Sequence, residues 1–162
     1  MIVPQALREC QLFAGLPYAT LEKIASLIVE KEYEPGTIIL REGESAEELF
    51  IVQEGKVALQ MTLPIPERQM SRKLTADILT KNEMLGWSAI VEPFVYTFTG
   101  VCLQKTRVFS ISGAKLRWLL EDNPKIGYEL LKGLIKVVAS RLEETRQLLI
   151  AERSVTLKTE QA

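Results

Sequence analysis

Residues 33–57 read YEPGTIILREGESAEELFIVQEGKV, and the interpretation of the rest of the chain starts from this stretch. Its apolar segments TIIL and ELFIV are separated by glycines at positions 36, 43 and 55. Glycine adopts the positive φ of a tight hairpin turn without steric cost. The stretch therefore predicts short antiparallel strands joined by turns at Gly36, Gly43 and Gly55.

The same pattern continues toward the C-terminus until about residue 112. In KVALQMTL, residues 56–63, larger apolar side chains alternate with polar or small ones, which is the period of a half-buried strand. Further short apolar segments follow at 75–80, 97–103 and 106–112. Several short strands with turns between them favour an antiparallel β-roll or jelly roll over a parallel sheet. We expect a mainly β fold with the roll over residues 33–112.

One segment inside the roll is not a core element. Residues 64–73, PIPERQMSRK, hold two prolines and four charges, which is typical of a projecting hairpin loop. We expect Arg68, Arg72 and Lys73 at its solvated tip; the alternative is that they form a basic contact patch.

Helices are expected on both sides of the roll. The helical spacing of Leu21, Ile24, Ala25 and Ile28 predicts helices within residues 4–32. After the roll we expect two helices over residues 113–153. The first is short and ends before Pro124, because the residue before a proline disfavours helical geometry. The second is long and begins at Pro124, because proline is favourable at a first helical position. The tail 154–162 is polar and expected to fray. Trp118, in the short helix, is expected in the core.

The long helix has two apolar faces. One stripe, confined to its first half, consists of Ile126, Leu130, Leu134 and Val137. The other has the alternating three- and four-residue spacing of a heptad seam and consists of Tyr128, Leu131, Ile135, Val138, Leu142, Thr145 and Leu149. We expect the first stripe to pack on the roll and the second, called the seam below, to pair with a second copy in a parallel homodimer. The alternative is that both stripes pack within one chain.

Composition narrows the possible partners and location. The 162 residues carry a net charge of −1, so no basic excess favours nucleic acid. No apolar run approaches the ~18 residues that a membrane span requires, and the N-terminus does not resemble a secretion signal. Two widely separated cysteines, Cys10 and Cys102, are expected to be inert buried thiols in a reducing, cytoplasmic setting. Only about ten polar residues follow Glu152, too few for a helix-turn-helix, so direct DNA binding is not expected.

The complete absence of histidine bears on chemistry. It removes Ser-His-Asp and Cys-His nucleophilic catalysis and the commonest transition-metal ligand. No pair of carboxylates can be placed in a common pocket from the sequence. We therefore expect no enzyme activity, no metal and no resident cofactor.

The stretch 33–57 resembles the cyclic-nucleotide-binding domain family, the ligand-sensing part of catabolite-activator-like regulators, of kinases and of channels. The shared pattern is Y..G..I...GE....LFIV..G.V, which begins here at Tyr33 and ends at Val57. An "F..L" at Phe13 and Leu16 precedes it, and an "L..LL..NP" from Leu116 to Pro124 follows it. The resemblance covers about residues 7–150 and implies a β-roll with N-terminal helices and a long C-terminal helix.

The resemblance breaks at the segment that would hold the ligand's phosphate. The family's pattern there is GE.A, followed by Arg-(Ser/Thr); the Arg pairs with the phosphate and the Glu accepts a hydrogen bond from the ribose. In this chain Trp87 stands in place of the Glu, and Tyr96 in place of the Arg, or Val95 if the register slips by one. Losing both charged contacts, at ~1.5–3 kcal/mol each, would weaken cyclic-nucleotide binding by roughly two to four decades. The candidate pocket residues are Gly86, Trp87, Ser88, Ala89, Tyr96 and Thr97.

Three interpretations of this segment are open. In the first, the aromatic side chains Trp87, Phe94 and Tyr96 fill the site and leave a platform for a dimer or a partner. In the second, backbone amides with Ser88, Thr97 and the Tyr96 hydroxyl bind a flatter or less charged, nucleotide-like ligand. In the third, a substitute arginine restores ordinary cyclic-nucleotide binding.

We favour the first interpretation; for the third, the candidate substitutes are Arg107 and a loop arginine. The sequence as a whole predicts a non-catalytic regulatory or interaction module that signals through its C-terminal helix to a partner protein. The alternative is a small-molecule sensor.

Overall fold

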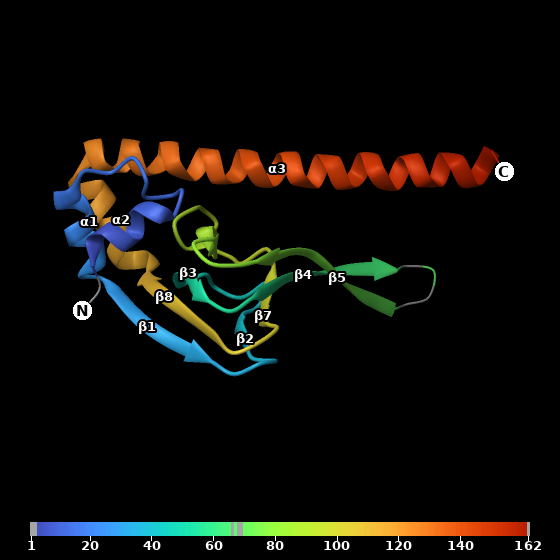
Figure 1. Cartoon of the computed structure of the whole chain (residues 1–162), viewed down its shortest axis with the longest axis horizontal. Coiled ribbons are helices and arrows are strands. Elements are labelled where there is room, and N and C mark those ends of the chain that lie inside the picture. The colour runs from blue at the N-terminus through green and yellow to red at the C-terminus, as the bar shows by residue number, and fades with distance from the viewer. Residues whose placement is uncertain (1–2, 66, 68–69, 162) are drawn as a thin grey trace.

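The computed structural model describes residues 3–65, 67 and 70–161, and two antiparallel sheets of four strands each form its centre (Figure 1). One sheet has the order β1-β8-β3-β6 and the other the order β2-β7-β4-β5. The strands are β1 (Ile28–Tyr33), β2 (Ile38–Leu40), β3 (Glu48–Glu54), β4 (Val57–Ile65), β5 (Met70–Leu79), β6 (Met84–Leu85), β7 (Thr99–Cys102) and β8 (Thr106–Ser112). The predicted antiparallel roll is confirmed, with Gly36, Gly43 and Gly55 all at positive φ.

The helices are η1 (Pro4–Glu9), α1 (Tyr18–Ala25), η3 (Trp87–Ala89), α2 (Gly113–Asp122) and α3 (Pro124–Gln161). Ser112 caps α2 by accepting a hydrogen bond from the Lys115 N–H, and α3 begins at Pro124 as predicted. The helices and the roll share one hydrophobic core that joins Phe13 and Leu21 to Phe50 and Leu116. No described helix is long and apolar enough to cross a membrane.

The prediction of helices up to residue 32 is wrong. The helix α1 ends at Ala25, and β1 begins at Ile28. All six residues of β1 pair with β8, from Ile28 opposite Ile111 to Tyr33 opposite Thr106. The apolar spacing that ends at Ile28 suits a helix, but pairing with a strand about eighty residues away determines the structure of this segment.

The prediction of a frayed tail over 154–162 is also wrong as far as residue 161. The helix α3 continues to Gln161, and no glycine or proline follows Gly133 to stop it. The hydroxyls of Thr156 and Thr159 donate to backbone carbonyls one turn back. The polar composition of this segment therefore keeps it exposed to solvent, but the segment remains helical.

The loop expected at 64–73 is shorter than predicted. Strand β4 runs through Pro64 to Ile65, and β5 begins at Met70, with Pro64 opposite Ser71. Proline is tolerated because this end of β4 pairs on one side only. Arg72 and Lys73 are exposed, and Arg68 lies outside the described residues.

The two faces of α3 differ as the sequence predicts. Leu130, Leu134 and Val137 are buried, whereas the seam is exposed, with 68% of Ile135 and 67% of Leu142 accessible. The expectation that Trp118 lies in the core is wrong, since 67% of it is exposed. The helix α2 turns Leu116 and Leu119 toward the core, which directs position 118 to solvent.

Candidate functional site

The segment that the sequence singles out begins where β6 turns into η3 at Gly86. Gly86 has a φ of +83°, and a Cβ there would lie 2.9 Å from the Glu48 carbonyl oxygen and 3.3 Å from Cε1 of Tyr96. Both the backbone conformation and the close approach therefore require glycine. Gly86 is thus packed directly against the start of β3 and against the Tyr96 ring.

Tyr96 is held at its backbone and at its hydroxyl. Its N–H donates to the Glu44 carbonyl at 3.0 Å, and its carbonyl accepts from the Gly43 N–H at 2.8 Å. Its hydroxyl donates to the Glu48 carbonyl at 2.6 Å and accepts from the Glu48 N–H at 3.1 Å. Only 8% of the residue is exposed. Burial raises the pKa of the phenol, although hydrogen bonding to the Glu48 backbone opposes the shift.

The other candidate residues are only partly brought together. Gly86, Trp87, Ser88 and Thr97 line a cavity of about 20 Å³, whereas Tyr96 does not line it although its ring lies against Gly86. Ala89 does not line it and is buried beside Gly113 at the start of α2.

Two arginines that sequence reasoning missed hold this segment from the helices. Arg117 of α2 donates to the Ala89 carbonyl, and its guanidinium lies 4.2 Å from the centre of the Phe94 ring. Arg141 of α3 donates to the Met84 carbonyl and lies 4.6 Å from the centre of the Trp87 ring. Neither belongs to a recognisable pattern, because each reaches the segment from a distant helix.

Arg141 is surrounded by acidic groups. Burial lowers its pKa, and the carboxylates of Asp77, Glu83 and Glu144 partly offset that shift. Its hydrogen bond and its stacking on Trp87 engage the guanidinium with the protein itself.

Arg107, the substitute named from the sequence, lies elsewhere. It is on β8 and forms ion pairs with Glu30 at 3.5 Å and Glu54 at 3.6 Å. It lines neither the small cavity nor the hollow described next.

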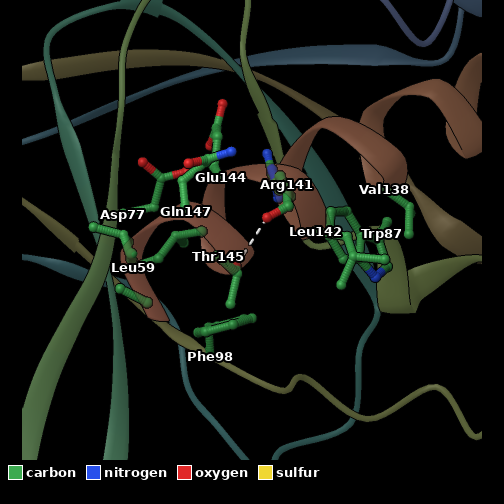
Figure 2. A pocket seen from close by; sticks show the side chains of 12 residues that line it. Leu59, Asp77, Trp87, Phe98, Val138, Arg141, Leu142, Glu144, Thr145 and Gln147 are labelled. Atoms are coloured by element: carbon green, nitrogen blue, oxygen red, sulfur yellow. Dashed lines mark hydrogen bonds between the residues drawn. The ribbon is translucent and has the colours of Figure 1, made fainter. Parts of the chain in front are cut away.

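A larger hollow of about 630 Å³ lies between α3 and the β4–β5 hairpin (Figure 2). Figure 2 shows Asp77, Glu144 and Gln147 gathered on one side of it and Trp87 on the other, with Arg141 between them. Apolar side chains make up most of the remaining wall, namely Leu59, Ala76, Phe98, Val138, Leu142 and Leu148, with Thr145 beside them. Val138, Leu142 and Thr145 also belong to the seam, so the hollow opens beside it.

The two cysteines are free and buried, as predicted. Burial raises the pKa of Cys10 to about 11, with hydrogen bonds from the Leu12 and Phe13 backbone and the Arg141 charge acting against it. Within residues 3–65, 67 and 70–161, no cluster of three or more His, Cys, Asp or Glu is arranged to bind a metal ion.

Comparison with known proteins agrees with this architecture. The sequence profile of the cyclic nucleotide-binding domain matches residues 30–123. A CRP-like cAMP-activated global transcriptional regulator of Mycobacterium tuberculosis is 24% identical over 141 residues, which cover 87% of this chain and 59% of the relative. The chain thus spans somewhat more than half the length of that protein.

Two solved structures extend the likeness. One, described as a cyclic nucleotide-binding protein of Geobacter metallireducens, is 29% identical with a TM-score of 0.74, and the match covers 88% of this chain and 99% of the other. The other is the N-terminal domain of a transcriptional regulator of Streptomyces coelicolor, 26% identical with a TM-score of 0.66 and a coverage of 89% and 94%.

Proposed function

This chain belongs to the cyclic nucleotide-binding domain family, and from that premise we propose that it is a non-catalytic regulatory module that does not bind cyclic AMP or cyclic GMP tightly. In this proposal it acts as a homodimer and passes its signal to a protein partner through α3. The family match and the regulatory relatives support the regulatory role.

The observation that carries the proposal is the position of Tyr96. In the family's pattern an arginine stands here to pair with the ligand's phosphate. In this chain the Tyr96 ring lies against Gly86, and its hydroxyl is bonded to the Glu48 backbone. The cavity of about 20 Å³ that Gly86, Trp87, Ser88 and Thr97 line has room for about one water molecule and none for a phosphate group.

The second substitution supports the same conclusion. Trp87, in place of the glutamate that would accept a ribose hydrogen bond, stacks against Arg141. Arg141 is the cation that lines the cavity, and it is already engaged by Met84 and Trp87. Each lost charge-assisted contact is worth ~1.5–3 kcal/mol, so both together would weaken binding by roughly two to four decades.

The homodimer is supported by the exposed seam. Its large apolar side chains are Tyr128, Leu131, Ile135, Val138, Leu142 and Leu149. They recur along one face of α3, with Thr145 between Leu142 and Leu149, and exposed apolar surface with heptad spacing marks an interaction site.

A non-catalytic role is supported by the residues available. The chain holds no histidine, and the relative in Mycobacterium tuberculosis is a transcriptional regulator. The cysteines are buried, and the raised pKa of Cys10 disfavours the reactive thiolate.

A small-molecule sensor is the second candidate, and the 630 Å³ hollow favours it. Six of its lining residues beyond Val138 belong to α3, so an occupant would contact the helix that carries the seam. Ligand binding would then change the packing of α3 and the signal that it passes on.

Isothermal titration calorimetry of the whole chain with cyclic AMP and cyclic GMP tests the proposal. We expect no saturable heat below millimolar nucleotide. A micromolar or tighter dissociation constant for either nucleotide would contradict it.

A further inference from the structure

The wall of the hollow between α3 and the β4–β5 hairpin is partly aromatic and apolar. Trp87 and Phe98 supply two aromatic rings, and Leu59 and Leu142 extend the apolar surface. At about 630 Å³ the hollow has the size of a small-molecule site. This part of the wall suits a planar aromatic body.

The part of the wall that Asp77, Glu144 and Gln147 form is rich in hydrogen-bond acceptors. Asp77 accepts through Oδ1 from the Ile78 N–H at 2.8 Å, which leaves its second carboxylate oxygen available. The amide nitrogen of Gln147 donates to Glu143, which leaves its carbonyl oxygen available. Within the described part of the chain, the Glu144 carboxylate has neither a hydrogen bond nor an ion pair.

The positive charge of Arg141 does not neutralise the two carboxylates of the wall. The Arg141 guanidinium donates to the Met84 carbonyl and stacks on Trp87. The two carboxylates and the Arg141 guanidinium together give the wall a formal charge of −1. A bound anion would therefore meet two carboxylates, whereas a bound donor group would find unpaired oxygens.

We propose that this hollow binds a small planar aromatic molecule that carries a positively charged amine- or amidine-type group directed at Asp77 and Glu144. The inference rests on the proposed function. In that function Tyr96 fills the position where a ligand's phosphate would bind, so the ligand of this chain need not be an anion. It specifies that function further by giving the charge and shape of what the module would sense. Aromatic stacking supplies most of the contact area, and the carboxylates set the preference for charge.

Three probes that share one ring system test the charge preference: 2-naphthamidine, 2-naphthamide and 2-naphthoate, titrated into the whole chain by calorimetry. We expect the cation to bind at least about tenfold more tightly than the anion, which corresponds to ~1.4 kcal/mol. The double variant Asp77→Asn/Glu144→Gln should remove that preference. Glu152→Gln, an exposed position further along α3, is the matched control and should retain it.

Equal binding of the three probes, tighter binding of the anion, or no binding of any probe would overturn the inference. So would a preference for the cation that survives the double variant. Cyclic AMP titrated in parallel separates this result from the proposed function. Tight cyclic AMP binding would contradict the proposed function itself, whereas absent naphthamidine binding with no cyclic AMP binding would overturn the ligand class alone.

Discussion

The hydroxyl of Tyr96 forms two hydrogen bonds with the backbone of a single residue, Glu48, donating to its carbonyl at 2.6 Å and accepting from its N–H at 3.1 Å. The side chain of Glu48 points elsewhere: it pairs with Lys31 of β1 and accepts from the Ser110 hydroxyl of β8. Burial acts to raise the pKa of the Glu48 carboxyl, but the bonds from Lys31 and Ser110 prevail and lower it. Glu48, at the start of β3, thus connects Tyr96 to Lys31 on β1, an edge strand of the same sheet as β3.

Replacing Tyr96 by Phe removes this link while keeping the ring. The Glu48 N–H and carbonyl would lose their partner, and a buried unpaired polar group costs ~1–3 kcal/mol. We expect urea unfolding to show a loss of that size. Tyr18→Phe, at an exposed tyrosine on α1, should change the free energy of unfolding by less than ~0.5 kcal/mol. Equal stabilities for the two variants would show that the Glu48 bonds contribute nothing.

The hold of Arg117 on the segment after Gly86 can be measured separately. Arg117→Met keeps an unbranched apolar side chain but removes the hydrogen bond to the Ala89 carbonyl and the stacking on Phe94. We expect faster amide hydrogen exchange in peptides covering residues 86–97, because this segment then opens more readily. The control is Arg146→Met on α3, whose ion pair with Glu143 is exposed. Unchanged exchange in the Arg117 variant would contradict the role assigned to it.

Alkaline pH should destabilise the protein through Cys10. Its pKa rises from an ordinary 9.0 to about 11 in the folded state, so folding favours the neutral thiol. That contribution is fully present below pH 9 and is lost as the pH rises toward 11. Unfolding midpoints measured across this range should fall more steeply for the wild type than for Cys10→Ser, whose hydroxyl does not titrate there. Parallel curves would mean that the Cys10 thiol is not held in its neutral form.

The seam predicts the oligomeric state. Light scattering at micromolar concentration should give twice the mass of one chain for the wild type. Leu142→Glu should give the monomer mass, because it places a charge in the centre of an apolar interface. Lys136→Glu, beside the seam on exposed helix surface, should remain dimeric. A monomeric wild type would contradict the homodimer.

The features that could be predicted from the sequence depend on interactions between residues close together in the chain. The turns at Gly36, Gly43 and Gly55 and the cap at Ser112 each depend on a few neighbouring residues, and the structure confirms them. The buried stripe through Leu130 follows from helical periodicity alone and is also confirmed.

What the sequence could not predict depends on contacts between distant residues. Ile28 lies in a strand because β8 pairs with it, and Tyr96 meets Glu48 across 48 positions of sequence. Arg117 and Arg141 reach the candidate site from helices that local patterns describe only as amphipathic. The substitutions at positions 87 and 96 were visible in the sequence, but the contacts that replace the family's charged groups were not.

The central claim is that Tyr96 occupies the position from which the family's arginine would hold a phosphate. Its most direct test compares cyclic AMP binding to the wild type and to Trp87→Glu/Tyr96→Arg by calorimetry. The control is Trp87→Glu/Val95→Arg, because 37% of Val95 is exposed. We predict millimolar or weaker binding for the wild type and the control, and a gain of roughly a hundredfold or more for the Tyr96 variant. Micromolar binding by the wild type, with no gain in a folded Tyr96 variant, would contradict the claim.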